Sequence, residues 1–105
     1  MTGFRGWTEN AEVIDPLTPE TLRELVSTAQ EFVVVDNPAW GKRFSARARR
    51  SGPERWQVEV RTESADRDLR TVGVNGDAAF DILRSWAAGD GWWRDAFIWD
   101  PLPTD

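Results

Sequence analysis

The sequence lacks both cysteine and histidine, and these two absences narrow the chemistry that the chain can perform. Without cysteine there is no disulfide framework, no thiolate nucleophile and no thiolate metal ligand. Without histidine, the Ser-His-Asp and Cys-His catalytic arrangements are excluded, as are zinc sites built on imidazole. Carboxylate chemistry stays open, either as an acid and base pair or as a site for a divalent ion.

Long apolar runs are also missing. No stretch approaches the ~18 consecutive apolar residues that a membrane-spanning helix needs, and Met1 to Trp7 lack the apolar run of a signal peptide. We therefore expect a cytoplasmic protein with no membrane partner. The 105 residues, of which 40% are hydrophobic and 30% charged, have the composition of a single globular domain spanning 1–105.

Tyrosine is absent and methionine occurs once, whereas the chain holds seven tryptophans and five phenylalanines. Tryptophan is large, and its indole N–H needs a hydrogen-bond partner when it is buried. A core of this size does not easily enclose so many indoles. We expect some of them to reach the surface.

Two amphipathic stripes predict helices. Thr18, an N-cap residue, precedes Pro19, and the apolar residues that follow recur at helical spacing. A second set of apolar residues at helical spacing lies between Asp77 and Gly89. We expect Asp77 to be the N-cap of this helix and Gly89 to be its C-terminal cap. The predicted helices span about residues 19–30 and 78–88.

Four segments predict strands. A β-branched run at 32–35 indicates a buried strand. Apolar and polar residues alternate over 44–49 and 56–61, which predicts a hairpin whose outer face pairs arginines with Gln, Glu and Arg. A further strand is expected at 69–74. The expected apolar face consists of Phe44, Trp56, Val58, Val60 and Val72.

The order of these elements predicts an α+β fold. It consists of an antiparallel meander of four strands, packed on one face by two helices and followed by an aromatic tail. Residues 1–15 are expected to form either a loosely attached arm or an edge strand, which would be the fifth strand.

Charge is unevenly distributed along the chain. The net charge is −5, but the segment from Lys42 to Arg55 carries +5, which leaves −10 for the remainder. A basic hairpin beside Trp40 and Trp56 would suit a nucleic-acid-binding module, with arginines on phosphates and indoles on bases. It is more typical of an arginine-faced strand edge that resists aggregation. Because strand alternation sends Trp56 to the core and the chain is acidic, we expect no nucleic-acid binding.

The carboxylates offer a further alternative. Asp77 and Asp81 lie one turn apart on the predicted second helix, which would allow a metal binder or a small carboxylate-dependent enzyme. No calcium-loop motif accompanies them, and the glycines near Gly73 lack the spacing of a phosphate-binding loop. We therefore predict no catalytic residues, no metal and no cofactor.

The adjacent tryptophans Trp92 and Trp93 stand in the most informative segment. Neighbouring side chains point in different directions, so at least one indole is expected to face solvent. Trp93, four residues before Phe97, is the better core candidate, and the tail aromatics together can close the core as a lid. An exposed Trp92 between Asp90 and Asp95 has the composition of a binding hot spot with a charged rim.

A helix that ends in Trp-Ala-x-Gly-Asp, followed at short distance by Trp-x-x-x-Phe-x-Trp, resembles the small immunity proteins of bacterial polymorphic toxin systems. The predicted order of elements, a helix, a four-strand meander and a second helix, is similar as well. The resemblance implies a cytoplasmic, non-catalytic protein that neutralises a cognate toxin, commonly a nuclease or deaminase, by covering its active site. The matching residues are Trp86, Gly89, Asp90, Trp93, Phe97 and Trp99.

A toxin that acts on nucleic acid presents a basic cleft, toward which an acidic inhibitor would be steered. We expect Trp92 to be the apolar anchor of such an interface. The acids beside it and those of the charged loop from Glu63 to Asp68 would steer the two proteins together. The predicted partner-binding residues are Trp92, Asp90, Asp95, Glu63, Asp66 and Asp68.

Overall fold

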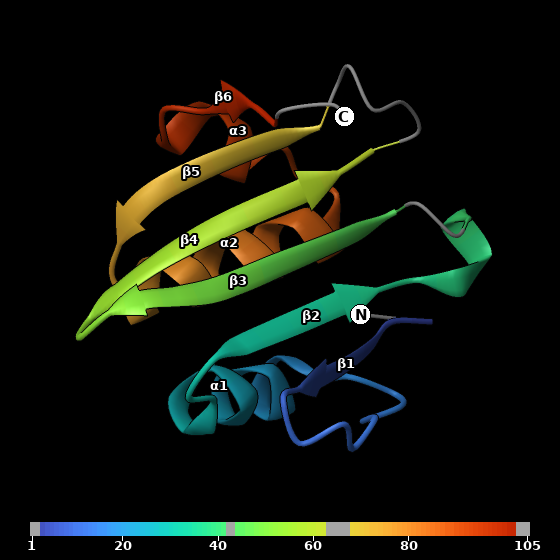
Figure 1. Ribbon diagram of the computed structural model, residues 1–105. Helices are drawn as coiled ribbons and strands as arrows, with labels where there is room; N and C mark the ends of the chain where they lie inside the picture. The colour runs from blue at the N-terminus through green and yellow to red at the C-terminus, as the bar shows by residue number, and fades with distance from the viewer. Residues whose placement is uncertain (1–2, 42–43, 63–67, 103–105) are drawn as a thin grey trace.

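Within the residues that the structure describes, 3–41, 44–62 and 68–102, six strands form one antiparallel sheet in which each strand pairs with the next (Figure 1). The computed structural model thus confirms the α+β class, with more strands than the four or five expected. The strands are β1 (Arg5–Thr8), β2 (Phe32–Asp36), β3 (Ser45–Gly52), β4 (Arg55–Arg61), β5 (Leu69–Val74) and β6 (Asp100–Pro101).

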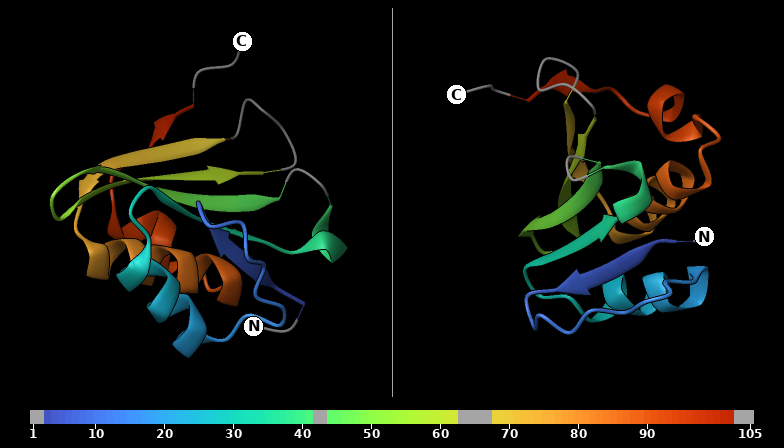
Figure 2. Two further views of the ribbon diagram at one scale, coloured as in Figure 1. Left: turned by 60° about the horizontal axis from the view of Figure 1, so that its bottom comes forward. Right: turned by 90° about the vertical axis from the view of Figure 1, so that its right-hand side faces the viewer.

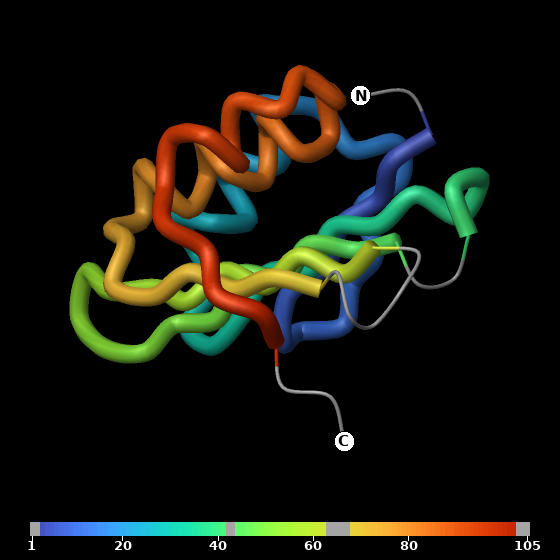
Figure 3. Tube along the Cα trace, turned by 90° about the horizontal axis from the view of Figure 1, so that it is seen from above, coloured from blue at the N-terminus to red at the C-terminus, as the bar shows by residue number. Residues whose placement is uncertain are grey.

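The helices lie together on one side of this sheet, and the opposite face carries no described helix (Figures 2 and 3). Two of them were expected from the sequence, and the short third one was not. Among the described residues, no helix has the length and apolar character needed to cross a membrane. The helices are α1 (Pro19–Thr28), α2 (Gly76–Ala88) and α3 (Trp92–Ala96), with a 3₁₀ turn, η1, at Pro38–Trp40.

The start of α2 differs from the prediction. Asn75, not Asp77, is the N-cap, and its Oδ1 accepts a hydrogen bond from the N–H of Ala78 over 2.8 Å. Asp77 lies inside the first turn. Asn and Asp are equally good caps, so the helix begins at the earlier of the two when the residue between them, Gly76, adopts helical angles.

The opening segment forms the edge strand β1, which pairs with β2. Beyond its end, the carboxylate of Glu9 accepts hydrogen bonds from the backbone N–H groups of Gln30, Glu31 and Phe32 at 3.0–3.1 Å. These bonds, the one from Gln30 foremost, lower the pKa of Glu9 to about 2. The segment is therefore held firmly to the start of β2 and is not a loose arm.

The outer side of β1 is partly paired as well. Gly6 exchanges backbone hydrogen bonds of 3.0 and 2.8 Å with Ile14 in the loop that follows. On the helix side, a Cβ at Gly6 would lie 3.1 Å from the Leu25 side chain and 3.2 Å from that of Leu17. The strand therefore approaches α1 as closely as it does because this residue is glycine.

The central hairpin has the predicted pairing. Arg47 lies opposite Glu59 and Arg49 opposite Gln57 on the outer face, while Trp56 points to the helices and is only 1% exposed. Val58 and Val60 share that inner face, where they pack with residues of α1 and α2 in one core cluster.

Val72 does not join the core, contrary to the prediction. A β-bulge displaces the register between β4 and β5, so that Val58 pairs with Thr71 and Trp56 pairs with Val74. Gly73, at φ +74°, provides the left-handed backbone that this bulge requires. Thr71, opposite Val58, faces the helices, so its neighbour Val72 lies on the outer face, where it is 60% exposed, and the extra residue then returns Val74 to the inner face.

Candidate functional site

The turn between α2 and α3 positions the predicted partner-binding residues of the tail. α2 ends at Ala88 and is capped by Gly89, whose left-handed backbone at φ +71° lets its N–H reach the carbonyl oxygens of Ser85 and Trp86. Gly91 repeats the left-handed conformation at φ +76°, and the chain then enters α3. Gly89 is thus the C-terminal cap that the sequence predicts.

A polar network inside this turn fixes the backbone of α3. Ser85 is fully buried, and its hydroxyl donates a hydrogen bond to Oδ1 of Asp90 while accepting one from the N–H of Trp93 over 3.0 Å. The same Oδ1 accepts the N–H of Trp92 over 3.0 Å. The hydrogen bond from Ser85, and then that from Trp92, lower the pKa of Asp90 below its ordinary value. Asp90 thus holds the turn together while remaining at the surface.

The two adjacent tryptophans separate as expected. Trp92 is 44% exposed and meets the edge of Phe97 at 5.8 Å between ring centroids. Trp93 is 6% exposed, belongs to the core cluster and stands edge-to-face with Trp99 at 5.1 Å. The prediction that Trp93 is the core residue and Trp92 the exposed one is confirmed.

We call the exposed residues on and beside α3 the α3 surface. Besides Trp92 it contains Ile98, one of the most exposed large apolar side chains of the described chain. Asp90 and Asp95 are both exposed there, as is Arg94, whose guanidinium lies 5.0 Å from the ring centroid of the buried Trp93. An apolar centre with a charged rim is the composition of a protein-binding surface.

Asp68 is not the surface acid that the sequence predicts. It is 2% exposed, and its carboxylate accepts the backbone N–H of Thr62 over 2.7 Å and lies 3.4 Å from Nη1 of Arg61. These contacts tie the end of β4 to the start of β5. A loop acid used in this way stabilises the fold and has no free oxygen surface for a partner. The other predicted loop acids, Glu63 and Asp66, lie outside the described residues.

Two arginines of the basic hairpin, Arg47 and Arg49, are exposed on the helix-free face of the sheet. The guanidinium of Arg47 lies 5.6 Å from the ring centroid of Phe32 on the neighbouring strand. Trp56 belongs to the other face and is not available to stack on a nucleic-acid base from there. The first residues of the basic segment, 42–43, lie outside the described residues.

Asp77 and Asp81 are each paired with an arginine. Asp77 forms an ion pair with Arg23 of α1 at 2.9 Å, and Asp81 lies 3.8 Å from Arg84 one turn later. Among the described residues there is no group of three or more acidic side chains placed to hold a metal ion.

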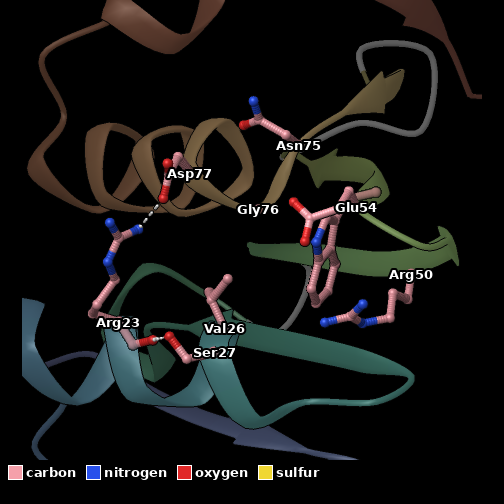
Figure 4. A pocket seen from close by; sticks show the side chains of 9 residues that line it. Arg23, Val26, Ser27, Arg50, Glu54, Asn75, Gly76 and Asp77 are labelled. Atoms are coloured by element: carbon pink, nitrogen blue, oxygen red, sulfur yellow. Dashed lines mark hydrogen bonds and ion pairs between the residues drawn. The ribbon is translucent and has the colours of Figure 1, made fainter.

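A pocket of about 380 Å³, which no sequence motif indicates, lies where α1, the β3–β4 hairpin and the start of α2 meet (Figure 4). Its walls combine charged and apolar groups from segments far apart in the sequence. They include Arg23 and Val26 of α1, Arg50, Glu54 and Trp56 of the hairpin, and residues 75–77.

Comparison of the chain with models of protein families, with curated proteins and with solved structures finds no match. The features of this chain that bear on function are therefore its fold, the α3 surface and the pocket.

Proposed function

We propose that this chain is a non-catalytic binding protein, and that it acts as an immunity protein that neutralises a cognate toxin by covering it with the α3 surface. The observation that carries the proposal is the position of Trp92. Its side chain is 44% exposed, whereas its backbone N–H is tied to Asp90 and the next residue is anchored to the buried Ser85.

An exposed indole on a fixed backbone is well suited to anchor a partner. A large aromatic side chain contributes apolar area with few rotatable bonds, and a preorganised backbone lowers the ordering cost of association. Trp92 has both properties, and the exposed Ile98 lies on the same terminal segment.

The negative charge of the chain favours a partner with a basic binding surface. The chain carries a net charge of −5, and Asp90 and Asp95 place two exposed acids beside the indole. A nuclease or deaminase toxin has a basic cleft for its substrate, and an acidic inhibitor associates with such a cleft faster at low salt. The resemblance of the tail to immunity proteins leads to the same class of partner, met in the cytoplasm.

The test is co-expression with the protein encoded next to this chain, followed by measurement of binding and of protection from its toxicity. Trp92→Ala should weaken binding by roughly thirtyfold or more, which corresponds to the loss of an interface anchor. Val13→Ala is the matched control, because Val13 is an exposed apolar residue in the loop after β1, at the far edge of the sheet from α3. Equal binding by both variants would exclude the α3 surface.

The nucleic-acid-binding module is the second candidate. The exposed Arg47 and Arg49 on the helix-free sheet face favour it, because such a face can follow a phosphate backbone. The burial of Trp56 and the acidic net charge oppose it. We therefore rank it below the protein partner.

A further inference from the structure

The pocket at the start of α2 is separate from the α3 surface. α2 has 13 residues, which makes it about 20 Å long, and the two places lie at its opposite ends. The volume of about 380 Å³ is within the range of about 300–1,000 Å³ that small-molecule sites occupy. A ligand there would not compete for the groups assigned to the partner.

The indole N–H of Trp56 is the first observation that indicates a ligand. Trp56 lines the pocket although its side chain is 1% exposed, and its Nε1 would be 3.5 Å from a Cβ built at Gly76. Within the described chain this N–H has no protein acceptor. Every fully enclosed side-chain N or O atom among the described residues does have a partner, so the Trp56 N–H opens onto the pocket. An indole N–H that faces a pocket and has no protein acceptor favours a ligand that supplies the acceptor.

The first turn of α2 adds donors at the same place. The first N–H groups of a helix have no partner inside it and stand at its positive end. Asn75 takes the N–H of Ala78 with its side chain and that of Ala79 with its carbonyl oxygen. In the described part of the chain this leaves the N–H groups of Gly76 and Asp77, which border the pocket, for an anionic ligand.

The charged groups and the donors of the lining together decide which anion fits. Arg50 lies over the Trp56 ring at 4.9 Å from its centroid and also lines the pocket, as does Glu54 (Figure 4). Arg23 and Asp77 neutralise each other in their 2.9 Å ion pair. Arg50 and Glu54 are then one cation and one anion, so charge alone favours neither a carboxylate nor phosphate. The indole N–H and the two backbone N–H groups are enough for the two oxygens of a carboxylate, whereas the four oxygens of phosphate would leave some without a donor beside Glu54.

We propose that this pocket binds the carboxylate group of a small molecule. The carboxylate accepts hydrogen bonds from the Trp56 indole and the start of α2, beside the guanidinium of Arg50. Val26 and the Trp56 ring form the apolar part of the wall, which suits a short apolar substituent on the carboxylate.

The experiment titrates the full chain with butyrate and follows the indole N–H resonance of Trp56 by NMR, assigned through its proximity to Gly76. Butyrate should move this resonance saturably, with a dissociation constant of about 1–10 mM for so small a ligand. Butyramide, which has the same shape without the charge, and inorganic phosphate should each bind at least about tenfold more weakly.

Two variants test the geometry. Gly76→Ala places a methyl group 3.5 Å from Trp56 Nε1, an ordinary contact distance that the fold tolerates and that blocks access to the N–H. Arg50→Gln removes the nearby cation. Each should lower butyrate affinity at least about tenfold, whereas Arg49→Gln, on the outer face of the same strand, should not. Melting curves confirm that each variant is folded.

The following results would overturn the proposal. They are the absence of a saturable shift with butyrate, an equal response to butyramide, and a preference for phosphate. Unchanged butyrate affinity in folded Gly76→Ala would likewise place the carboxylate elsewhere.

Discussion

The indole N–H of Trp99 donates a hydrogen bond to the main-chain carbonyl oxygen of Trp93 over 2.9 Å. This bond returns the tail to α3 and holds the two rings edge-to-face. Both residues therefore belong to the structure of the turn. The side chain of Trp92, the first residue of α3, makes no comparable polar contact among the described residues.

This difference predicts opposite effects on stability. Trp93→Ala removes a buried indole and should lower the free energy of unfolding by about 3–5 kcal/mol. Trp92→Ala should change it by no more than about 0.5 kcal/mol, because the side chain is 44% exposed and lies outside the core cluster. Denaturant midpoints of the two variants make the comparison. A strongly destabilised Trp92→Ala would show that this indole is part of the fold and would weaken the proposed interface.

Helix α2 offers a second pair of matched variants. Leu83 is fully buried in the core cluster, so Leu83→Ala should cost about 2–5 kcal/mol of unfolding free energy. Asp81 is partly exposed and has a loose ion pair with Arg84, so Asp81→Ala should be almost neutral. The reverse order in urea unfolding would give Asp81 a buried or functional role.

Glu9 should make the stability of the protein dependent on pH. Its pKa is about 2 in the folded chain, below the ordinary value of 4.5, so its contribution is complete above pH 4.5 and is lost as the pH falls toward 2. Glu9→Gln should be less stable than the wild type near neutral pH, and the difference should shrink through this range. Glu24→Gln, an exposed acid on α1, is the control whose difference should stay small at every pH. A constant gap for Glu9→Gln would contradict the assigned role.

Salt dependence separates the protein partner from a nucleic-acid partner. Phosphate contacts release counterions, so real nucleic-acid binding would fall steeply as salt is raised. We expect no measurable affinity for single-stranded DNA or RNA at physiological salt. Micromolar binding that disappears in the double variant Arg47→Ala and Arg49→Ala would instead favour the helix-free sheet face as the functional surface.

Local patterns predicted the centre of the molecule well because their physical causes are local. Alternation over the β3–β4 hairpin fixed which side chains face the helices, and Trp56 is buried as expected. The adjacency of Trp92 and Trp93 was enough to predict that they diverge. Val72 was assigned to the wrong face because Leu69 and Thr71 occupy the inner positions, and the extra residue that returns Val74 to the inner face was marked locally only by Gly73.

The features that were missed depend on contacts between distant segments. Glu9 meets backbone N–H groups more than twenty residues away, and nothing near it in sequence marks it as their acceptor. Asp68 lies in a charged stretch of the sequence, yet its carboxylate accepts a hydrogen bond from the N–H of Thr62 at the end of β4. The pocket forms where α1, the β3–β4 hairpin and the start of α2 come together. The hydrophobic periodicity within each element does not predict how these elements pack against one another.

The two edges of the sheet affect how readily the protein aggregates at high concentration. A free strand edge offers unpaired backbone groups to a second molecule and can seed ordered aggregates. Here Gly6 of β1 already exchanges its hydrogen bonds with Ile14. At the other edge β6 pairs only with Leu69 and Arg70 and contains Pro101, which has no N–H to donate, and the bulge at Gly73 interrupts the remaining edge of β5. We therefore expect a chain rich in strands and indoles to remain free of fibrils on prolonged storage.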